Sequence, residues 1–490
     1  MENQALIQPA TTWDGKIYTG AWTPPGQGTA TVTEKATGRA LGTIGIASPE
    51  DVAAAARAAR IAQRKWANLA GPARGDILRE AGRLILLHAE ELSEQLIRET
   101  GSIRAKANWE VHVTAREFTE AAALGSQPQG VLTATLEAGF QSIARRVPLG
   151  VIGVLTPWNS PFILGGRAIA PALAMGNAVV LKPDVQSPVI GGVAFARLLE
   201  DAGLPAGLFH VLPGGADTGT ALVKDPAIDM ISFTGSTRVG REVGSIASGL
   251  LKRVSLELGG NNPYIVFDDA DVEAAASAGA WGSFFHQGQI CLTTGRHLIH
   301  ERIAPAYIDA LVRKAKALRV GNPLDEKVQV GPIINERQAA NAERILAETV
   351  AKGAQVLAGG ERDGLFFQPT VVTGVAPGMA AFEEEIFGPI AAVTTFRTEP
   401  EAVALANATE YGLSAAVVSN DLARAQRVAD ALRSGVVHIN DQTVVHGVYG
   451  PIGGAGMSGN GFGHGTVTNI DQFSEWQWIT TRSHLPDYPF

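Results

Sequence analysis

The amino-acid sequence predicts a doubly wound α/β fold followed by a second α/β domain. From residue 151 onward, short apolar runs alternate with stretches of helical periodicity, and the first four runs are residues 151–155, 178–181, 208–212 and 230–233. Buried parallel strands read as such uninterrupted apolar runs, and their alternation with helices is typical of a parallel sheet covered on both faces. The alternation resumes at residues 263–267. A chain of 490 residues has room for about three domains, which accommodates a second sheet.

The first 150 residues show other patterns. Residues 1–45 are rich in Gly, Thr and Pro, and we expect them to wrap the surface. Apolar residues recur at helical spacing from Pro49, and again over residues 77–97, which predicts two amphipathic helices. The period then changes, because residues 131–136 and 141–146 flank a Gly-containing turn and predict a β-hairpin.

Helical stretches separate the apolar runs, as the alternation requires, and continue through the second domain. The expected helices are residues 189–202, 271–285, 303–318, 335–351, 400–408 and 421–432. Residues 472–481, with two tryptophans and an isoleucine, predict a final strand.

Composition and charge exclude several classes of protein. Hydrophobic residues make up 46% of the chain and charged residues 18%, which is a globular rather than a disordered composition. A net charge of −8 argues against nucleic-acid binding, because neutralising phosphates requires clusters of basic residues. No apolar run reaches the roughly 18 residues that span a bilayer, and no signal peptide is visible. We therefore expect a cytoplasmic protein with no nucleic-acid or membrane partner.

Cys291 is the only cysteine in the chain. A single cysteine cannot form an internal disulfide or a thiolate metal site, and no metal is expected. Two interpretations stay open, a small apolar core residue and a catalytic thiolate. Residues 271–285 predict a buried helix that breaks at residues 287–289, and the cysteine follows that break. A thiol placed after a Gly-containing turn can face a cleft, which favours the catalytic interpretation.

Small and polar residues stand where the predicted strands end. They are Asn159, Lys182, Gly235 and Ser236. Open α/β sheets bind ligands at the carboxyl ends of their strands, so we expect a ligand site at this edge. The GxGxxG pattern at residues 454–459 has no helix after it, and a tight loop explains it better than a dinucleotide fingerprint.

Six short segments together resemble the aldehyde dehydrogenase superfamily. They are Thr156–Asn159, Leu181–Pro183, Phe233–Gly240, Glu257–Gly260, Gly288–Cys291 and Glu385–Pro389. Any one of them is weak evidence, but they occur in the family's order and spacing over nearly the whole chain. Within the superfamily, residues 286–291 and Lys182–Asp184 resemble the benzaldehyde dehydrogenase group.

The resemblance implies an organisation in three parts. Residues 1–126 and 149–257 would form a Rossmann-like dinucleotide-binding domain, and residues 258–468 the catalytic domain. Residues 127–148 and 469–490 would form a small β arm that resembles the family's oligomerisation arm. We therefore expect a homodimer or homotetramer.

The resemblance also implies catalytic roles. Cys291 would add to the aldehyde carbonyl, and the Asn159 amide with the Cys291 backbone N–H would stabilise the oxyanion. Glu257 would be the base that activates water against the thioester, with a pKa raised by its apolar neighbours. Without the resemblance, Asn159 reads as a helix N-cap and Glu257 as a strand residue facing solvent.

The implied cofactor is NAD or NADP. The residues that the resemblance places around it are Thr156, Pro157, Trp158, Lys182, Gly235, Ser236, Gly240, Leu258, Glu385 and Phe387. Strictly NAD-dependent relatives usually carry a glutamate three residues after the strand-end lysine, where this chain has Val185. Because the carboxylate that would repel a 2′-phosphate is missing there, we expect slight preference for NAD with use of NADP as well.

We expect the substrate to be an aromatic aldehyde. The residues expected to form its slot are Ser160, Leu164, Phe285, Ile290 and Leu292. Ser160 is small where many relatives carry a bulky aromatic residue, and the others provide apolar walls for a flat ring. Alternatives stay open: these side chains as ordinary core, an aliphatic or semialdehyde substrate, a CoA-acylating enzyme, or a cysteine hydrolase with His286 as its base.

Overall fold

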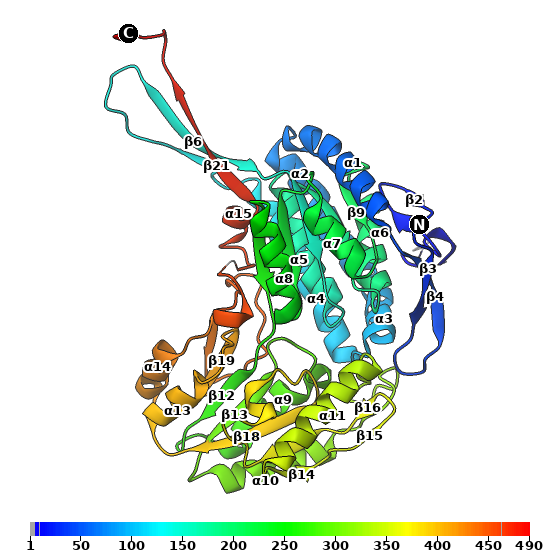
Figure 1. Cartoon of the computed structure of the whole chain (residues 1–490), viewed down its shortest axis with the longest axis vertical. Coiled ribbons are helices and arrows are strands. Elements are labelled where there is room, and N and C mark those ends of the chain that lie inside the picture. Colours follow the sequence, from blue (N-terminus) through cyan, green and yellow to red (C-terminus); the bar gives the residue numbers. More distant parts are fainter. Residues whose placement is uncertain (1–4, 9, 462) are drawn as a thin grey trace.

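Two seven-stranded sheets form the centre of the molecule (Figure 1). The computed structural model describes residues 5–8, 10–461 and 463–490. The first sheet contains, in spatial order, β11 (Arg253–Glu257), β10 (Met230–Thr234), β7 (Val151–Leu155), β8 (Ala178–Lys182), β9 (Phe209–Val211), β1 (Ile17–Tyr18) and β2 (Trp22–Thr23). The strands from β11 to β9 are parallel, and β1 and β2 extend the sheet antiparallel. The predicted doubly wound α/β fold is confirmed.

Helices cover both faces of the first sheet. Because side chains alternate along a strand, Ile152 and Val154 of β7 pack in one core, and Val151 and Leu155 pack in another. The helices around the first core are α2 (Gly71–Leu87), α3 (Ala89–Thr100), α4 (Arg104–Leu124), α5 (Pro161–Ala174) and α6 (Ala194–Asp201). The helices around the second core are α1 (Pro49–Ala67), α7 (Ala216–Lys224) and α8 (Thr237–Gly249).

The second sheet repeats this plan. Its strands, in spatial order, are β14 (Gln355–Ala358), β17 (Thr370–Thr373), β18 (Ile390–Phe396), β13 (Thr294–His300), β12 (Asn262–Val266), β19 (Ser414–Val418) and β20 (Val436–Ile439). All neighbouring strands are parallel except β14, which runs antiparallel to β17. Its helices are α9 (Val272–Phe284), α10 (Ala304–Ala317), α11 (Glu336–Ala351), α12 (Ala380–Glu383), α13 (Glu399–Ala406) and α14 (Leu422–Ala431).

A three-stranded arm projects from the domain that contains the first sheet (Figure 1). β21 (Ser474–Thr481) pairs antiparallel with the full length of β6 (Gln141–Pro148), and β5 (Gly130–Leu132) adds a short third strand. The predicted hairpin and C-terminal strand are confirmed, although β5 is shorter than expected. The remaining elements are the hairpins β3 (Thr29–Thr33)–β4 (Ala40–Gly45) and β15 (Arg362–Asp363)–β16 (Phe366–Phe367), the short helix α15 (Asn469–Gln472), and 3₁₀ turns η1 (Ala10–Thr12), η3 (Phe285–Gly288) and η4 (Gly456–Ser458).

Two helix predictions were wrong in their detail. The single helix expected over residues 77–97 is two helices, α2 and α3, which meet at His88. His88 has non-helical dihedral angles, yet its N–H caps α2 by binding Leu84 and its carbonyl accepts from Leu92. The helix expected over residues 189–202 begins as the π-helix η2 (Val189–Val193), because the buried Glu99 carboxylate accepts the N–H groups of Val189 and Ile190.

Residues 1–45 were expected only to wrap the surface, but they contribute strands and core. β1 joins the first sheet beside β9, and Trp13 and Ile17 are fully buried. Helix α1 then starts at a capping box, in which Ser48 accepts from the Asp51 N–H and Asp51 accepts from the Ser48 N–H.

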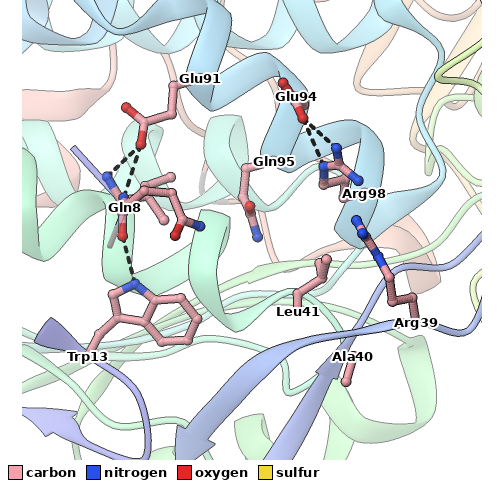
Figure 2. A pocket seen from close by; sticks show the side chains of 10 residues that line it. Gln8, Trp13, Arg39, Ala40, Leu41, Glu91, Glu94, Gln95 and Arg98 are labelled. Atoms are coloured by element: carbon pink, nitrogen blue, oxygen red, sulfur yellow. Dashed lines mark hydrogen bonds and ion pairs between the residues drawn. The ribbon is translucent and has the colours of Figure 1, made fainter. Parts of the chain in front are cut away.

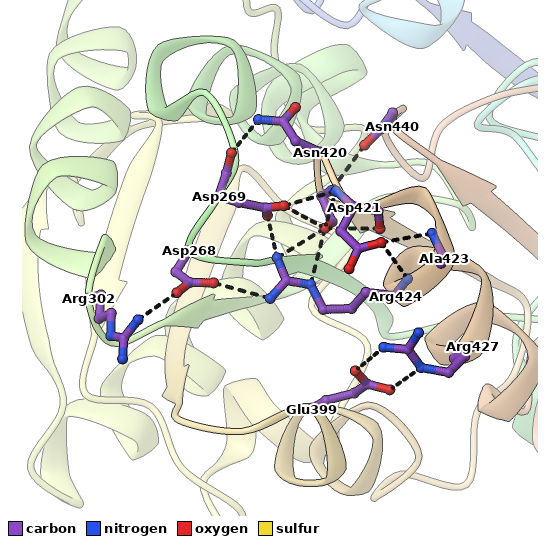
Figure 3. A network of polar contacts seen from close by, with 11 residues as sticks. Asp268, Asp269, Arg302, Glu399, Asn420, Asp421, Ala423, Arg424, Arg427 and Asn440 are labelled. Atoms are coloured by element: carbon purple, nitrogen blue, oxygen red, sulfur yellow. Dashed lines mark hydrogen bonds and ion pairs between the residues drawn. The ribbon is translucent and has the colours of Figure 1, made fainter.

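A network of polar contacts surrounds the end of β12 in the domain that contains the second sheet (Figure 3). Arg424 of α14 pairs with Asp269 at 2.6 Å and with Asp268 at 3.3 Å, and its guanidinium lies 4.5 Å from the centre of the Phe267 ring. The Asp421 N–H also donates to Asp269. These carboxylates are therefore paired with arginine, and no group of metal-binding side chains occurs in the described parts of the chain. No helix among the described residues is long and apolar enough to cross a membrane.

Candidate active site

The predicted catalytic residues lie where the two sheets meet. β11 ends at Glu257 on the carboxyl edge of the first sheet, and only residues 258–261 separate it from the start of β12. Cys291 comes shortly before β13, the neighbour of β12, and Asn159 follows β7. The three side chains therefore come from the carboxyl edge of one sheet and the amino edge of the other.

The segment of residues 285–293, here called the Cys loop, is held in an unusual conformation. His286, Gln287 and Gly288 have φ angles of 51°, 56° and 67°, so three consecutive residues are left-handed. Such a conformation costs a non-glycine residue roughly 1–2 kcal/mol. Buried amides hold it in place: Gln287 donates to the carbonyls of Gly101 and Pro332 at 2.6 and 3.0 Å, and Gln289 accepts from the Ile334 N–H at 3.0 Å.

Cys291 lies at the end of this loop and is partly exposed. Asn262 donates to the carbonyls of Cys291 and Thr293, both at 2.8 Å, and thereby fixes the backbone around the thiol. Burial raises the pKa of Cys291 to about 12, Arg167 opposes that rise, and Glu385 and Glu257 add to it. The thiol therefore needs a further positive charge, besides that of Arg167, to ionise near neutral pH.

Asn159 is buried against the Cys loop. Its side-chain amide donates to the carbonyl of Gln289 at 2.9 Å, which leaves its second N–H for another acceptor. The backbone carbonyl of Asn159 accepts from Lys106 Nζ at 3.0 Å. One contact therefore holds the backbone of Asn159, and the other holds its side chain beside the loop that carries the thiol.

A buried ion pair beneath Asn159 was not expected from the sequence. Lys106 and Glu110 of α4 are completely buried and in direct contact. Glu110 also accepts the N–H groups of Phe162 and Ile163 at 2.9 and 3.2 Å, so it caps the start of α5. The i,i+4 spacing of the two residues was the available signal, but no helix was predicted there.

Glu257 is buried and has an incomplete set of partners. Its nearest cation is Arg167, whose Nη2 lies 3.8 Å from Glu257 Oε2, and Oε1 has no hydrogen-bond partner among the described residues. Burial raises the pKa of Glu257 to about 8, against the opposing effect of Arg167. A carboxyl group with a pKa near the working pH is suited to accept a proton from water.

No hydrogen bond joins His286 to Cys291 among the described residues, whereas a hydrolase base would require one. His286 Nδ1 lies 3.4 Å from Ser102 Oγ, and its Nε2 has no hydrogen-bond partner among the described residues. Burial, reinforced by the charge of Lys106, holds the pKa of His286 well below its ordinary value. The arrangement gives no support to the cysteine hydrolase.

The carboxyl edge of the first sheet offers groups for a dinucleotide. Helix α8 starts directly after Gly235 and Ser236, and Ser236 caps it without a side-chain hydrogen bond, so N–H groups at its start can meet an anion. A Cβ at Gly240 would overlap the Leu258 side chain, so α8 and the segment after β11 pack closely. Thr156 and Pro157 follow β7, and Lys182 ends β8, where its aliphatic chain lies over Gly219.

The domain that contains the second sheet contributes the segment around Glu385 to the site. Glu385 accepts from the Gly260 N–H at 3.0 Å, and burial raises its pKa to about 7. Phe387 has a left-handed φ of 54°, and its ring lies edge-on to Trp158 with the ring centres 5.5 Å apart. A small cavity separates this segment from the Cys loop, lined in part by Ile290, Glu385 and Phe387.

Three of the five predicted substrate residues belong to one apolar cluster that lies against Cys291. Phe285, Ile290 and Leu292 pack in one apolar cluster with Leu413, and Cys291 and Val444 lie against that cluster. Leu164 is buried on α5 and Ser160 is buried at the position just before α5, and neither is a member of this cluster. Trp281, which the sequence did not single out, stacks on Phe285 with the ring centres 4.2 Å apart and an angle of 16°.

The glycine-rich residues 454–459 form a loop, as predicted. The Leu258 N–H donates to Ser458 O at 2.9 Å, and Gly459 bridges to Glu257. This loop therefore supports the strand that carries Glu257.

A larger cavity of about 400 Å³ lies elsewhere, between α3 and the N-terminal segment (Figure 2). None of the predicted site residues lines it. Its charged groups are already paired, since Glu91 accepts N–H groups from Leu6 and Ile7, and Arg98 pairs with Glu94 and Glu34.

Comparison with known proteins identifies the family. The model of the aldehyde dehydrogenase family matches residues 22–479. The chain belongs to the aldehyde dehydrogenase family. A vanillin dehydrogenase of Amycolatopsis sp. is 51% identical, and a benzaldehyde dehydrogenase [NAD(+)] of Pseudomonas putida is 44% identical, each over 98% of both chains. The crystal structure of an E. coli NADP dependent enzyme superposes with a TM-score of 0.93 at 34% identity, over 97% of this chain and 99% of the other.

These similarities confirm the resemblance inferred from the six motifs. The chain is an NAD(P)-dependent aldehyde dehydrogenase by family. The roles of its individual residues stay predictions, which the geometry above makes specific.

Proposed function

We propose that this aldehyde dehydrogenase oxidises aromatic aldehydes to their carboxylic acids, with Cys291, Asn159 and Glu257 as its catalytic residues. The observation that carries the proposal is the apolar, partly aromatic cluster that lies against Cys291. Phe285 presents a ring to this cluster and Trp281 stacks behind it. The names of the two relatives, vanillin dehydrogenase and benzaldehyde dehydrogenase, support the same class of substrate.

In the first half-reaction, the Cys291 thiolate adds to the aldehyde carbonyl and forms a thiohemiacetal. The second N–H of the Asn159 amide and the backbone N–H of Cys291 stabilise the negative oxygen. A donor of this kind contributes about 3–4 kcal/mol to transition-state stabilisation. NAD or NADP, when bound, would supply the acceptor for the hydride, and departure of the hydride from the thiohemiacetal leaves Cys291 acylated as a thioester.

In the second half-reaction, Glu257 takes a proton from water as the water attacks the thioester. Oε1 of Glu257 has no hydrogen-bond partner among the described residues, so it is available for that water. The presence of this buried carboxylate favours hydrolysis over transfer of the acyl group to CoA.

The chain offers a consistent set of groups for the nicotinamide cofactor. The start of α8 would hold the pyrophosphate, Lys182 the adenosine ribose, and Glu385 with Phe387 the nicotinamide end. Val185 provides no charge against a 2′-phosphate, whereas Asp184 and Asp217 lie close enough to Lys182 to affect its pKa. We therefore propose that the enzyme uses both cofactors and prefers NAD. Its activity with NADP should lie within about two orders of magnitude of its activity with NAD, because the close repulsive charge pair that would cost several kcal/mol is missing at Val185.

A panel of aldehydes tests the proposal by the absorbance of the reduced cofactor. Benzaldehyde, vanillin, acetaldehyde and succinic semialdehyde should each be run with NAD and NADP, with and without CoA. We expect the aromatic aldehydes to exceed acetaldehyde in kcat/KM by about 30–150-fold, because a buried ring contributes about 2–3 kcal/mol more than a methyl group. Cys291→Ala should abolish turnover while cofactor binding, measured by fluorescence titration, persists.

Other outcomes separate the alternatives. Faster turnover of acetaldehyde or succinic semialdehyde would remove the aromatic assignment. A requirement for CoA would make Glu257 something other than the hydrolytic base. Wild-type rates in Cys291→Ala would remove the thiol mechanism itself.

A further inference from the structure

Helix α5, which follows Asn159, is capped by a residue of another helix. Ser160 is its N-cap residue, but the Ser160 side chain accepts no hydrogen bond from the start of the helix. Glu110 of α4 accepts instead from the N–H groups of Phe162 and Ile163, at 2.9 and 3.2 Å. A carboxylate at this place also interacts favourably with the positive end of the helix dipole. The start of α5 is therefore held to α4 through the Glu110 carboxylate.

Lys106 joins this carboxylate to the backbone of Asn159. It lies one turn before Glu110 on α4, its ammonium group contacts the Glu110 carboxylate, and its Nζ donates to the Asn159 carbonyl at 3.0 Å. Both charged side chains are completely buried. On the other side, the Asn159 amide donates to the Gln289 carbonyl of the Cys loop at 2.9 Å. Contacts from α4 and from the Cys loop therefore meet at one residue, Asn159.

The stability of the fold is a weak explanation for this buried pair. Taking two charges out of water carries a large desolvation penalty, and apolar residues of similar volume often serve a fold at least as well. A contact of the same kind elsewhere in this chain uses no charge, since the buried Gln63 of α1 donates to the Gly176 carbonyl at 3.0 Å. The acceptor of Lys106 differs from that of Gln63, because it belongs to a residue bonded to the loop that carries the thiol.

We propose that Lys106 and Glu110 are positioning residues that hold the Asn159 amide where it stabilises the oxyanion formed when Cys291 attacks a carbonyl group. In that step the thiolate sulfur bonds to the carbonyl carbon, and the π electrons of the C=O bond move to the oxygen. A donor contributes most when it stands in place before this charge develops. Lys106 fixes the Asn159 backbone from α4, so the amide keeps its place when the Cys loop moves. The inference rests on the proposed catalytic role of Asn159.

Two reactions of Cys291 separate this role from a general loss of structure, and Cys291 is the only thiol in the chain. Acylation by p-nitrophenyl acetate passes through an oxyanion and releases p-nitrophenolate, which is followed by its absorbance. Alkylation by iodoacetamide displaces iodide at a saturated carbon and forms no oxyanion. Both rates should be measured on the full-length protein without aldehyde or cofactor, so that neither depends on dehydrogenase turnover.

Lys106→Met combined with Glu110→Gln removes both charges and keeps an oxygen that can accept from the start of α5. We expect acylation to slow by about 10–100-fold, because a small misplacement of a group at the reacting centre has effects of this size. Alkylation should stay within about twofold of the wild-type rate. Lys106→Met alone should give the same result even if the double variant fails to fold, because a buried Glu110 can take up a proton. Gln63→Met is the matched control and should leave both rates unchanged.

Asn159→Ala tests whether the pair acts through the amide. This change removes the amide but keeps the backbone carbonyl that Lys106 binds, and it should slow acylation by about 10²–10³-fold. Adding Lys106→Met and Glu110→Gln to Asn159→Ala should slow acylation no further, because no amide is left to position.

Losses that multiply in the combined variant would overturn the proposal. Acylation at the wild-type rate, or an equal loss of alkylation, in a folded Lys106→Met variant would also overturn it. If Asn159→Ala were itself acylated at the wild-type rate, the proposed catalytic role of Asn159 would fall, and the inference would fall with it. The rate of Asn159→Ala therefore distinguishes the two failures.

Discussion

At the scale of single residues, burial determines which protons are present at the site. Burial raises the pKa of Glu257 to about 8 and that of Cys291 to about 12. At pH 7, with Arg167 in place, most of Glu257 is therefore protonated and Cys291 is a thiol. Since the base acts in its ionised form, hydrolysis of the thioester should speed up as the pH rises toward 8.

Glu257→Gln separates the two half-reactions. Glutamine keeps the shape of the side chain but cannot accept a proton, so hydrolysis should slow while attack by the thiolate continues. We expect a burst of reduced cofactor close to one equivalent per active site, followed by turnover reduced by about 10²–10⁴-fold. Rapid mixing with benzaldehyde measures both phases.

The matched control is Glu384→Gln, which changes an exposed glutamate that pairs with Arg344. Its burst and steady state should equal those of the wild type. Simultaneous loss of burst and turnover in Glu257→Gln would show that Glu257 is needed before the thioester forms, as an activator of Cys291.

The site residues that the sequence could predict lie within short motifs, and those it missed depend on distant partners. Cys291 and Glu257 each stand in a recognisable segment, and the fold brings them to one junction. Arg167 could not be interpreted from its own segment, because its contacts come from Thr234 and Glu257 on two other strands. Lys106 was missed for the same reason, since its bond to Asn159 joins residues far apart in the chain.

At the scale of elements, the Cys loop depends on a glycine. Gly288 has a φ of 67°, and a Cβ there would overlap the carbonyl oxygen of Gly388. Gly288→Ala should therefore push the Cys loop away from the segment that carries Glu385 and Phe387. We expect a loss of activity of tenfold or more, and a loss of stability of about 2 kcal/mol or more from overpacking and strain together. Steady-state assay and denaturant unfolding measure the two effects.

Gly364 provides the control for backbone strain alone. Its φ is 56°, and nothing lies within 4 Å of the position that a Cβ would occupy. Gly364→Ala should cost about 1 kcal/mol and leave activity unchanged. If Gly288→Ala proved no worse than Gly364→Ala, the close packing of the Cys loop would not matter for catalysis.

Elements were predictable where the apolar pattern has one period over many residues. Strands β7 to β10 of the first sheet and helices α10, α11 and α14 fall within a few residues of expectation, because each buries a continuous face. The break at His88 does not show in the sequence pattern, since the apolar residues of α2 and α3 keep helical spacing across it. The π-helix η2 could not be predicted from its own residues either, because the Glu99 carboxylate that accepts N–H groups from its start lies on α3.

At the scale of the whole molecule, the three-stranded arm has few contacts within its own chain that would stabilise it. Its sheet has the order β21–β6–β5, so β21 and β5 are both edges. Leu132 is 76% exposed and Trp478 is 70% exposed on these two strands. Small sheets with exposed apolar side chains are marginal alone, and an open edge can pair with a strand of another molecule.

We therefore expect a dimer or tetramer in which the arm extends a sheet of its partner. Light scattering at micromolar concentration should give a mass of two or four times the 51.3 kDa chain.

Leu132→Glu combined with Trp478→Glu places charges on the two exposed strands and should shift the assembly toward smaller species. Leu422→Glu is the matched control, because this residue is 62% exposed on α14, away from the arm. The double variant should keep its fold, since neither side chain belongs to a core. A monomeric wild-type protein would contradict the expectation, and an assembly that survives the double variant would place the interface on another surface.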